Sequence, residues 1–562
     1  MYNFVPKRFS FSMNNSNLTL AIYGIQDLSE DPCPVYVHDH NLTLYENGEI
    51  IKHLALERHT RLKYDSRLPG YLYRLLKQEK MLGIRNMDLV FVDNLIGRAF
   101  ISKEGQIRFE GPLNEGLAGM PEKGYGYFLD KTTDAWVVNH ELAHVFSNLP
   151  FHGPFKENSL HVHFDGGASK SNFSAWIFRE GRLRLLEYHW DLDYLASFFN
   201  SNALTFSLVG ARREDQNSMP GKFMGYAAYG NYDSKIGFWL EENNYFTGIW
   251  GRRKFFFDRV RKDWKKDIGS FDLKHPFLQD IAATFQHIFQ RELLKKMEKL
   301  KAATGAECLY YSGGSALNIK TNAALLNSGL FRQVFIPPCT NDSGLSIGAG
   351  ALVEWLKQGY VKHKSPFLNN WFLNVPEVAY SDTDISRIAG ILYEGKAVAV
   401  INGYGETGPR ALGNRSILAR ADSLHLSDYV SRELKQREWY RPLAPVMLES
   451  HLPYFTEDIG APRLSRYMLT EFNIRPERIN ELKGVVHVDG TSRIQSLAER
   501  AENPFLYDLL KMLEEHYKIR ALINTSFNSK GKPLVHTEQD ALDETRRMGI
   551  KYLVVNGVLK EV

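Results

Sequence analysis

Two histidines in the segment NHELAH, His140 and His144, are four residues apart and have a glutamate, Glu141, between them. Side chains four residues apart share one face of a helix, so both imidazoles could bind one metal ion. The pattern fits H-E-x-x-H, in which the glutamate activates a zinc-bound water for peptide hydrolysis. The extended form of that motif needs Gly and His where this chain has Ser147 and Pro150. The motif therefore predicts a metal site and leaves its chemistry open.

Two aspartates stand in glycine-rich segments, Asp165 in HFDGGAS and Asp342 in TNDSGLSIGAG. Glycine lets backbone amides approach a phosphate closely, and a neighbouring carboxylate can hold the metal that neutralises it. A third segment, SGGSALN, places Gly313 and Gly314 between an expected strand and an expected helix start. A nucleotide-phosphate site accounts for these loops more economically than a peptidase site. The alternative for Asp165 is a loop-capping role.

The segments around these residues predict an α/β fold with a repeated unit. Residues 17–26 predict a strand, and Asn47-Gly48 predicts a hairpin turn after it. Residues 159–189 repeat the order of strand, small-residue loop and hairpin, which indicates a duplicated lobe. Helical spacing covers 276–305, and the proline-containing stretch 358–385 indicates a domain boundary. Further strands are predicted at 396–403, 520–526 and 551–558.

The composition is that of a soluble, multi-domain protein. The chain has 562 residues, a net charge of +4 and only three cysteines. This pattern excludes a disulfide framework, so any metal must use His, Asp or Glu. Neither a secretory signal nor a membrane span is expected, which predicts a cytoplasmic protein without a membrane partner.

One basic segment, RRKFFFDRVRKDWKK at 252–266, has interleaved aromatic residues. Such a segment could contact RNA or phosphate. Because Asp258 and Asp263 interrupt the run, we favour an amphipathic helix with a solvated basic face, and no nucleic-acid partner is expected.

Several segments together resemble a known family. LERHTRLKYDSRLP (56–69) resembles the "EERxxRxKHD" stretch of the O-carbamoyltransferases of the nodulation-protein and antibiotic-tailoring type. NHELAH, DGGAS, GKFMGYAAYG, SGGSALNIKTN and NDSGLSIGA match the first domain of that family in order. GETGPRALGNRSIL, LKQREWYRPLAPVML, HVDGTSRIQSL and LINTSFNSKGKPLVHTEQDAL match its second domain. The ordered set is specific, although no single segment would be.

The resemblance implies an enzyme with two α/β domains. Residues 1–365, with an N-terminal extension at 1–16, would form an actin/Hsp70-like ATPase domain of duplicated lobes that transfers the carbamoyl group. Residues 366–562 would form a YrdC-like domain that processes carbamoyl phosphate. The implied reaction converts carbamoyl phosphate and ATP to carbamoyl-adenylate and then carbamoylates a hydroxyl group of a small-molecule acceptor.

The same resemblance implies site residues in the first domain. A divalent metal, iron(II), zinc or manganese, would be held by His140, His144, Asp165 and Asp342, with magnesium an option for ATP. ATP would lie against Gly166, Gly167, Gly313, Gly314, Asn318 and Lys222, although Lys222 is equally well explained as an exposed lysine. His38 would be the general base, with Asp39 orienting it.

In the second domain the resemblance implies a carbamoyl phosphate site. Arginine offers forked, always-charged donors that suit a phosphate dianion. The residues implied are Arg410, Arg415, Lys435, Arg441, Arg493, Asn524 and Ser526, while Arg437 is interpreted as structural.

This chain departs from the family pattern at one place near the expected base. Where the family has "HDAS", the chain has His38-Asp39-His40-Asn41, and two larger residues replace small ones. This substitution puts a local phosphate or acceptor contact in question.

Three functions stay open at this point. The leading one is an ATP-dependent O-carbamoyltransferase. The others are an H-E-x-x-H zinc peptidase and a threonylcarbamoyl-tRNA-type transferase, or in place of the latter a non-catalytic nucleotide-binding scaffold. The acceptor, the metal and the oligomeric state, including a homodimer, are not determined by these motifs.

Overall fold

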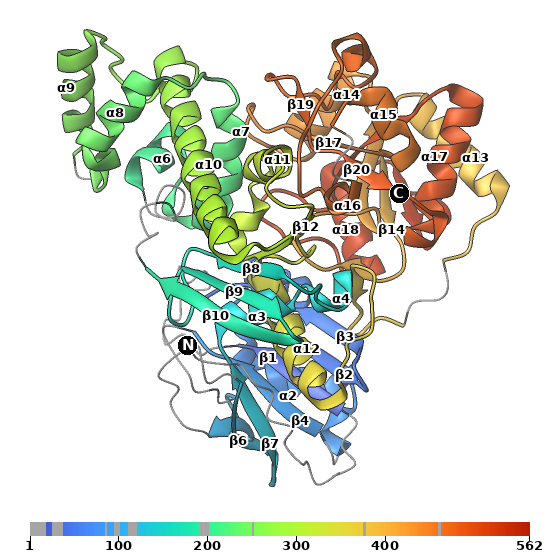
Figure 1. The fold of residues 1–562 in the computed structure, drawn as a ribbon. Helices are drawn as coiled ribbons and strands as arrows, with labels where there is room; N and C mark the ends of the chain where they lie inside the picture. Colours follow the sequence, from blue (N-terminus) through green and yellow to red (C-terminus); the bar gives the residue numbers. More distant parts are fainter. Residues whose placement is uncertain are drawn as a thin grey trace.

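The computed structural model describes residues 18–24, 37–84, 87–94, 100, 102–110, 121–190, 195, 202–249, 252–374, 378–458 and 462–562. The N-terminal extension predicted at 1–16 lies outside these residues. Both domains contain helices packed on β-sheets, which confirms the α/β class (Figure 1).

The first domain contains two sheets with the same strand order. In the first sheet the order β3-β2-β1-β4-β7 is formed by β1 (Leu18–Tyr23), β2 (Asn41–Glu46), β3 (Glu49–Ala55), β4 (Met87–Val92) and β7 (Lys131–Val138). In chain order, β1, β2 and β3 are antiparallel neighbours, and β4 and β7 run parallel to β1. The second sheet repeats this arrangement. This repetition confirms the actin/Hsp70-like duplicated lobe. The second sheet, β10-β9-β8-β11-β12, uses β8 (Ser159–Phe164), β9 (Phe173–Arg179), β10 (Arg182–His189), β11 (Cys308–Ser312) and β12 (Gln333–Phe335).

Two helices join the lobes. Helix α12 (Leu345–Gln358) packs on the first sheet, and α3 (His140–Phe146) packs on the second. The two helices also pack against each other (Figure 1). A Cβ atom on Gly348 would lie 1.7 Å from the carbonyl oxygen of Ala143, so only glycine permits this approach. The ends of these helices are therefore held at the seam between the lobes.

A helical subdomain extends from the second lobe. It contains α6 (Ala203–Leu208), α7 (Met219–Ala227), α8 (Ser234–Glu242), α9 (Arg253–Trp264) and α10 (Pro276–Thr304), followed by α11 (Ile319–Asn327). Helix α10 confirms the helix predicted over 276–305, and Gly305 ends it in the left-handed conformation.

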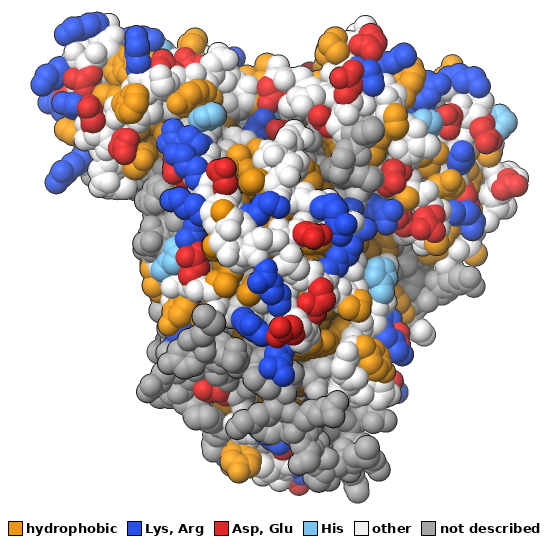
Figure 2. Space-filling model, viewed as in Figure 1, with side chains coloured by type: hydrophobic (Ala, Val, Ile, Leu, Met, Phe, Trp, Pro, Cys, Tyr) orange, Lys and Arg blue, Asp and Glu red, His pale blue; other side chains and the backbone are white. Residues whose placement is uncertain are grey.

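The basic segment 252–266 contains α9, which is an amphipathic helix. Phe256 and Val260 are buried, while Arg261 pairs with Asp258 (3.2 Å) on the exposed face. Figure 2 shows basic side chains interspersed with acidic ones over this corner of the molecule. The interpretation as a solvated helix face is confirmed.

The second domain is built on a seven-stranded mixed sheet, and its order is β20-β17-β21-β16-β14-β22-β23. The strands predicted near 396–403, 520–526 and 551–558 are confirmed as β14 (Val398–Ile401), β21 (Ala521–Ser526) and β22 (Tyr552–Val555). The remaining strands are β16 (Arg415–Arg420), β17 (Ala444–Leu448), β20 (Gln495–Leu497) and β23 (Val558–Glu561). Helices α13 (Asp382–Tyr393) and α17 (Pro504–Tyr517) pack together, and α18 (Glu538–Met548) contacts β14 and β22.

The domains contact each other through both lobes. Strands β13 (Phe367–Asn369) and β15 (Gly405–Glu406) extend the first sheet beyond β3. On the second lobe, Lys222 lies 3.1 Å from Glu438 and Lys320 lies 2.6 Å from Asp489. Among the described residues, no helix combines the length and apolar character needed to cross a bilayer.

Candidate functional site

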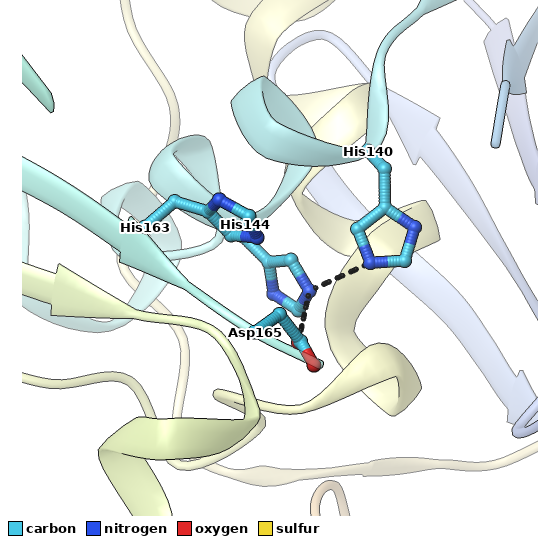
Figure 3. Close-up of side chains that lie close together, drawn as sticks. All are labelled: His140, His144, His163 and Asp165. Carbon is cyan, nitrogen blue, oxygen red and sulfur yellow. Dashed lines mark hydrogen bonds and ion pairs between the residues drawn. The ribbon is translucent and has the colours of Figure 1, made fainter. Parts of the chain in front are cut away.

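The predicted metal-binding histidines lie at the start of α3. Asn139 caps this helix by accepting a hydrogen bond from the amide of Leu142 (3.1 Å), which places His140 in its first turn. The Nε2 atoms of His140 and His144 are 3.0 Å apart, and both side chains are buried. Two adjacent imidazoles therefore present nitrogen atoms to one point (Figure 3).

The two predicted aspartates converge on the same point from different elements. Asp165 follows β8, and its Oδ2 lies 3.2 Å from His144 Nε2. Asp342 precedes α12, and its Oδ1 lies 3.4 Å from His140 Nε2 and 3.5 Å from His144 Nε2. Two imidazoles and two carboxylates form a donor set suited to iron(II), zinc or manganese. The four residues come from both lobes, so their geometry depends on how the lobes pack.

The charges at this cluster are strongly coupled. Burial alone would raise the pKa of Asp342, but His140 and His38 hold the pKa of that carboxyl well below its ordinary value. Burial alone would lower the pKa of His144, but Asp165 and Asp342 raise it to about 9. The carboxylates therefore stay charged and require positive charge between them. A protonated histidine or a bound divalent ion can supply this charge.

His163 lies in the same cluster and was missed by the sequence analysis. One ligand atom from each of His140, His144, His163 and Asp165 lies within 4.8 Å of the other three. The pattern H-x-D on a predicted strand could have indicated this residue, because side chains two apart on a strand share a face. Burial holds the pKa of its imidazole well below the ordinary value.

Glu141 faces away from the paired imidazoles. Its Oε1 accepts hydrogen bonds from the amides of Lys170 (2.7 Å) and Ser171 (2.9 Å), and from the Ser171 hydroxyl (3.1 Å). The carboxylate therefore holds the loop after Asp165. A water-activating base, as the peptidase pattern requires, would need this carboxylate beside the metal.

Replacing Glu141 by glutamine is expected to destabilise the protein without affecting metal binding. The glutamine amide places an N–H group among hydrogen-bond donors and loses the charge-assisted hydrogen bonds. This loss is expected to lower the free energy of unfolding by about 2–4 kcal/mol. The thermal midpoint should fall, while bound metal measured by elemental analysis stays at the wild-type level. Peptide cleavage by the wild type that is lost in Glu141→Gln would contradict this structural role.

The predicted base lies beside the cluster. His38 Nδ1 is 3.1 Å from Asp39 Oδ2 and 3.9 Å from Asp342 Oδ2. Burial lowers the pKa of His38, but Asp342 and Asp39 together raise it to about 9. A cation bound at Asp342 would offset the largest raising contribution and bring this imidazole closer to the range of a general base.

The two residues that depart from the family pattern are part of the framework. The Asn41 amide donates to the Asp342 carbonyl (2.9 Å), and its oxygen accepts from the Ser346 amide (3.0 Å). His40 is buried and accepts a hydrogen bond from the amide of Leu68 (3.3 Å). Both larger side chains therefore fix the loop that carries His38.

The predicted ATP-binding residues divide into two groups. Gly314 lies at the metal cluster, where its amide donates to Asp165 Oδ2 (2.8 Å). A Cβ atom on Gly313 would lie 2.2 Å from the Phe164 carbonyl oxygen, so this turn requires glycine. Asn318, by contrast, caps α11, and Lys222 pairs with Asp215 (2.6 Å) and Glu438. Gly166 and Gly167 directly follow Asp165.

A second candidate site is a cavity of about 240 Å³ in the second domain. Residues of the first domain close one side of this cavity. It brings together six of the predicted residues and further cations, among them Lys63 and Arg437. Lys63 was missed because it comes from the first domain, and Arg437 had been interpreted as structural. The lining includes Lys63, Arg410, Lys435, Arg437, Arg441, Arg493, Asn524 and Ser526.

Positive charges in this cavity destabilise one another. Burial and then neighbouring cations lower the pKa of Arg410 to about 10 and that of Arg437 to about 9. Burial and Arg410 also hold the pKa of Arg493 well below its ordinary value. Among the described residues, the buried Nε atoms of Arg410 and Arg493 have no hydrogen-bonding partner. An anion in the cavity would satisfy these donors and reverse the shifts.

Two other lining residues are held by protein contacts. Lys435 donates to the carbonyl of Ser526 (2.6 Å), to its hydroxyl (3.1 Å), and to Asn528. This lysine therefore fixes the turn after β21. Asn524 donates to Gln495 Oε1 (2.6 Å), which leaves its own buried Oδ1 as an acceptor without a partner in the described chain.

The structure does not bring Arg415 to the cavity. Its buried guanidinium donates to five backbone carbonyls at 2.8–3.2 Å, so every N–H group is used. The carbonyls belong to Asn402, Gly403, Asn414, Val535 and His536. Arg415 thus ties together loops of the second domain.

Two family profiles match the chain. Residues 125–351 match the family described as "Carbamoyltransferase N-terminus", and residues 389–561 match "Carbamoyltransferase C-terminus". The curated relative "Nodulation protein NolNO" of Sinorhizobium fredii is 27% identical over 96% of this chain and 82% of its own length. "Nodulation protein U" of Azorhizobium caulinodans is 32% identical over 56% of this chain and 58% of its own.

Solved structures are more distant. Full-length HypF in the phosphate- and nucleotide-bound form is 12% identical and has a TM-score of 0.32 over 61% of this chain and 56% of its own. HypF of T. kodakarensis is also 12% identical and has a TM-score of 0.33 over 63% of this chain and 49% of its own.

Proposed function

This chain belongs to the carbamoyltransferase family, and from that membership we propose that it is an ATP-dependent O-carbamoyltransferase acting on a small-molecule hydroxyl group. The proposed reaction has three stages. Carbamoyl phosphate is cleaved with water to carbamate and phosphate, carbamate and ATP form carbamoyl-adenylate and pyrophosphate, and the carbamoyl group passes to the acceptor oxygen.

The observation that carries this proposal is the cationic cavity of the second domain. Its unpartnered arginine donors suit the phosphate of carbamoyl phosphate, and its volume suits a small ligand. The buried Oδ1 of Asn524 is an acceptor, and the carbamoyl amide is a donor that would satisfy it. As the bond to phosphate breaks, Arg410 and Arg493 would offset the charge that develops on the leaving group.

The first domain supports the later stages. The glycine turns at 166–167 and 313–314 would admit nucleotide phosphate beside the histidine and aspartate cluster. A divalent metal held by His140, His144, Asp165 and Asp342 would supply positive charge for the nucleotide phosphate or the carbamoyl oxygen. His38 would accept the proton of the acceptor hydroxyl, and Asp39 (3.1 Å) would orient its ring.

The two alternative functions have less support. Zinc-dependent peptide hydrolysis needs Glu141 as a base, and this carboxylate is bound to the 169–171 loop. A tRNA substrate has its direct support in the basic helix α9, where Arg259 and Arg261 pair with Asp263 and Asp258. We therefore assign neither function to the chain.

The proposed function is tested without knowing the acceptor. Purified protein is mixed with ATP, a divalent metal and carbamoyl phosphate, and pyrophosphate is measured while mass spectrometry detects carbamoyl-adenylate. Pyrophosphate release that requires carbamoyl phosphate is the expected result. Pyrophosphate release without carbamoyl phosphate, or none with any metal tested in the presence of candidate acceptors, would overturn the assignment.

A further inference from the structure

His163 lies close enough to three of the predicted ligands, His140, His144 and Asp165, to bind the same ion. It lies on β8 two residues before Asp165, and its side chain is fully buried. Its ring stacks on that of His144 with centroids 5.2 Å apart, and the His140 ring lies 6.2 Å away. Figure 3 shows the four side chains close together, with the His163 ring beside that of His144 on the side away from His140.

A hydroxyl group on the neighbouring strand orients this imidazole. Ser174 on β9 is the direct partner of His163 in the sheet, and its Oγ lies 3.2 Å from His163 Nδ1. An N–H at Nδ1 that donates to this hydroxyl leaves the lone pair on Nε2. Nε2 is buried and has no hydrogen-bonding partner among the described residues. This arrangement is typical of metal-binding histidines, whose second nitrogen is held by a polar partner.

The distances are compatible with a shared ion. Ligand atoms at opposite sides of one metal lie about 4.2 Å apart, since each bond is about 2.1 Å long. The four ligand atoms that include one from His163 lie within 4.8 Å of one another, so shifts of a few tenths of an ångström bring them into range.

We propose that His163 is an additional metal ligand, which makes the donor set three imidazoles and two carboxylates. This inference rests on the metal centre in the proposed function. Imidazole nitrogen favours zinc, cobalt and iron(II), whereas carboxylate and water favour magnesium and manganese. His163 therefore biases the site toward the nitrogen-preferring ions and against magnesium.

Cobalt(II) binding tests this inference on the full-length protein. Metal-free wild type and His163→Gln are titrated with cobalt(II), and the visible absorption bands and the dissociation constant are measured. The matched control is His161→Gln, which changes another buried histidine on β8 whose ring stacks on Tyr310 at 4.6 Å. A milder variant, Ser174→Ala, removes only the orienting hydroxyl.

We expect His163→Gln to weaken cobalt binding by about 100-fold or more and to change the absorption bands, and Ser174→Ala to weaken binding by roughly 10-fold. His161→Gln should bind as the wild type does. Wild-type affinity and an unchanged spectrum in His163→Gln would overturn the inference.

The outcome is separable from the proposed function. A wild type that binds no cobalt would overturn the metal centre together with this inference. Carbamoyl-phosphate-dependent pyrophosphate release by the wild type tests the function independently of which residues hold the ion.

Discussion

The Arg493→Ala variant is expected to lose carbamoyl-phosphate-dependent pyrophosphate release by about 100-fold or more, the usual cost of removing one donor to a developing charge. Its guanidinium lines the cavity, and its Nε has no partner among the described residues. Burial and Arg410 hold its pKa well below the ordinary value. Removing it relieves repulsion in the free protein, so the thermal midpoint should stay the same or rise while activity falls.

Two further variants make this result specific. Arg493→Lys keeps the positive charge but lacks the forked N–H donors of the guanidinium. Its rate of pyrophosphate release should lie between those of the wild type and Arg493→Ala. Arg500→Ala removes an exposed arginine that pairs with Asp508 (2.7 Å) outside the cavity, and it should leave the rate unchanged. If Arg493→Ala released pyrophosphate at the wild-type rate, the cavity could not be the carbamoyl phosphate site.

The second large effect is expected at the histidine pair, where His144→Ala should abolish metal binding. His144 Nε2 contacts Asp165 and Asp342, so its loss separates the two carboxylates from their shared partner. A ligand at 100 times its dissociation constant stabilises a protein by about 2.7 kcal/mol. Added zinc or cobalt should therefore raise the thermal midpoint of the wild type but not that of the variant.

The control for this prediction is a histidine that follows His144 in the chain but lies outside the cluster. His152 lies at the end of α4 (Leu149–His152) and is within hydrogen-bonding distance of the Ile336 carbonyl oxygen (3.0 Å). His152→Ala should keep the metal-dependent rise. A rise of equal size in His144→Ala would show that the ion binds elsewhere.

The sequence was sufficient for residues whose neighbours along the chain reveal their role. His140 and His144 share a helix face, and the two glycine-rich loops indicated Asp165 and Asp342. The repeated strand and hairpin pattern likewise predicted the duplicated lobe. These are regularities between residues close together in the chain. The folded structure adds which atoms of these residues contact one another.

Long-range contacts decided the residues that sequence analysis could not place. Arg410 and Arg415 stand in one segment, GPRALGNR, yet one lines the cavity and the other binds five carbonyls. Nothing in the segment distinguishes two arginines five residues apart. Lys63 reaches the cavity from the first domain, and this contact depends on how the domains pack.

The Lys222–Glu438 and Lys320–Asp489 pairs have a consequence for protein engineering. Each pair joins the second lobe of the first domain to the second domain, and one member of each pair, Glu438 and Lys320, lines the cavity. A chimera that exchanged only the second domain with a relative would leave lysines without partners and a cavity open on one side. Because Lys63 lines the same cavity and strands β13 and β15 extend the first sheet, modular recombination of this enzyme should transfer both lobes together with the C-terminal domain as one cassette.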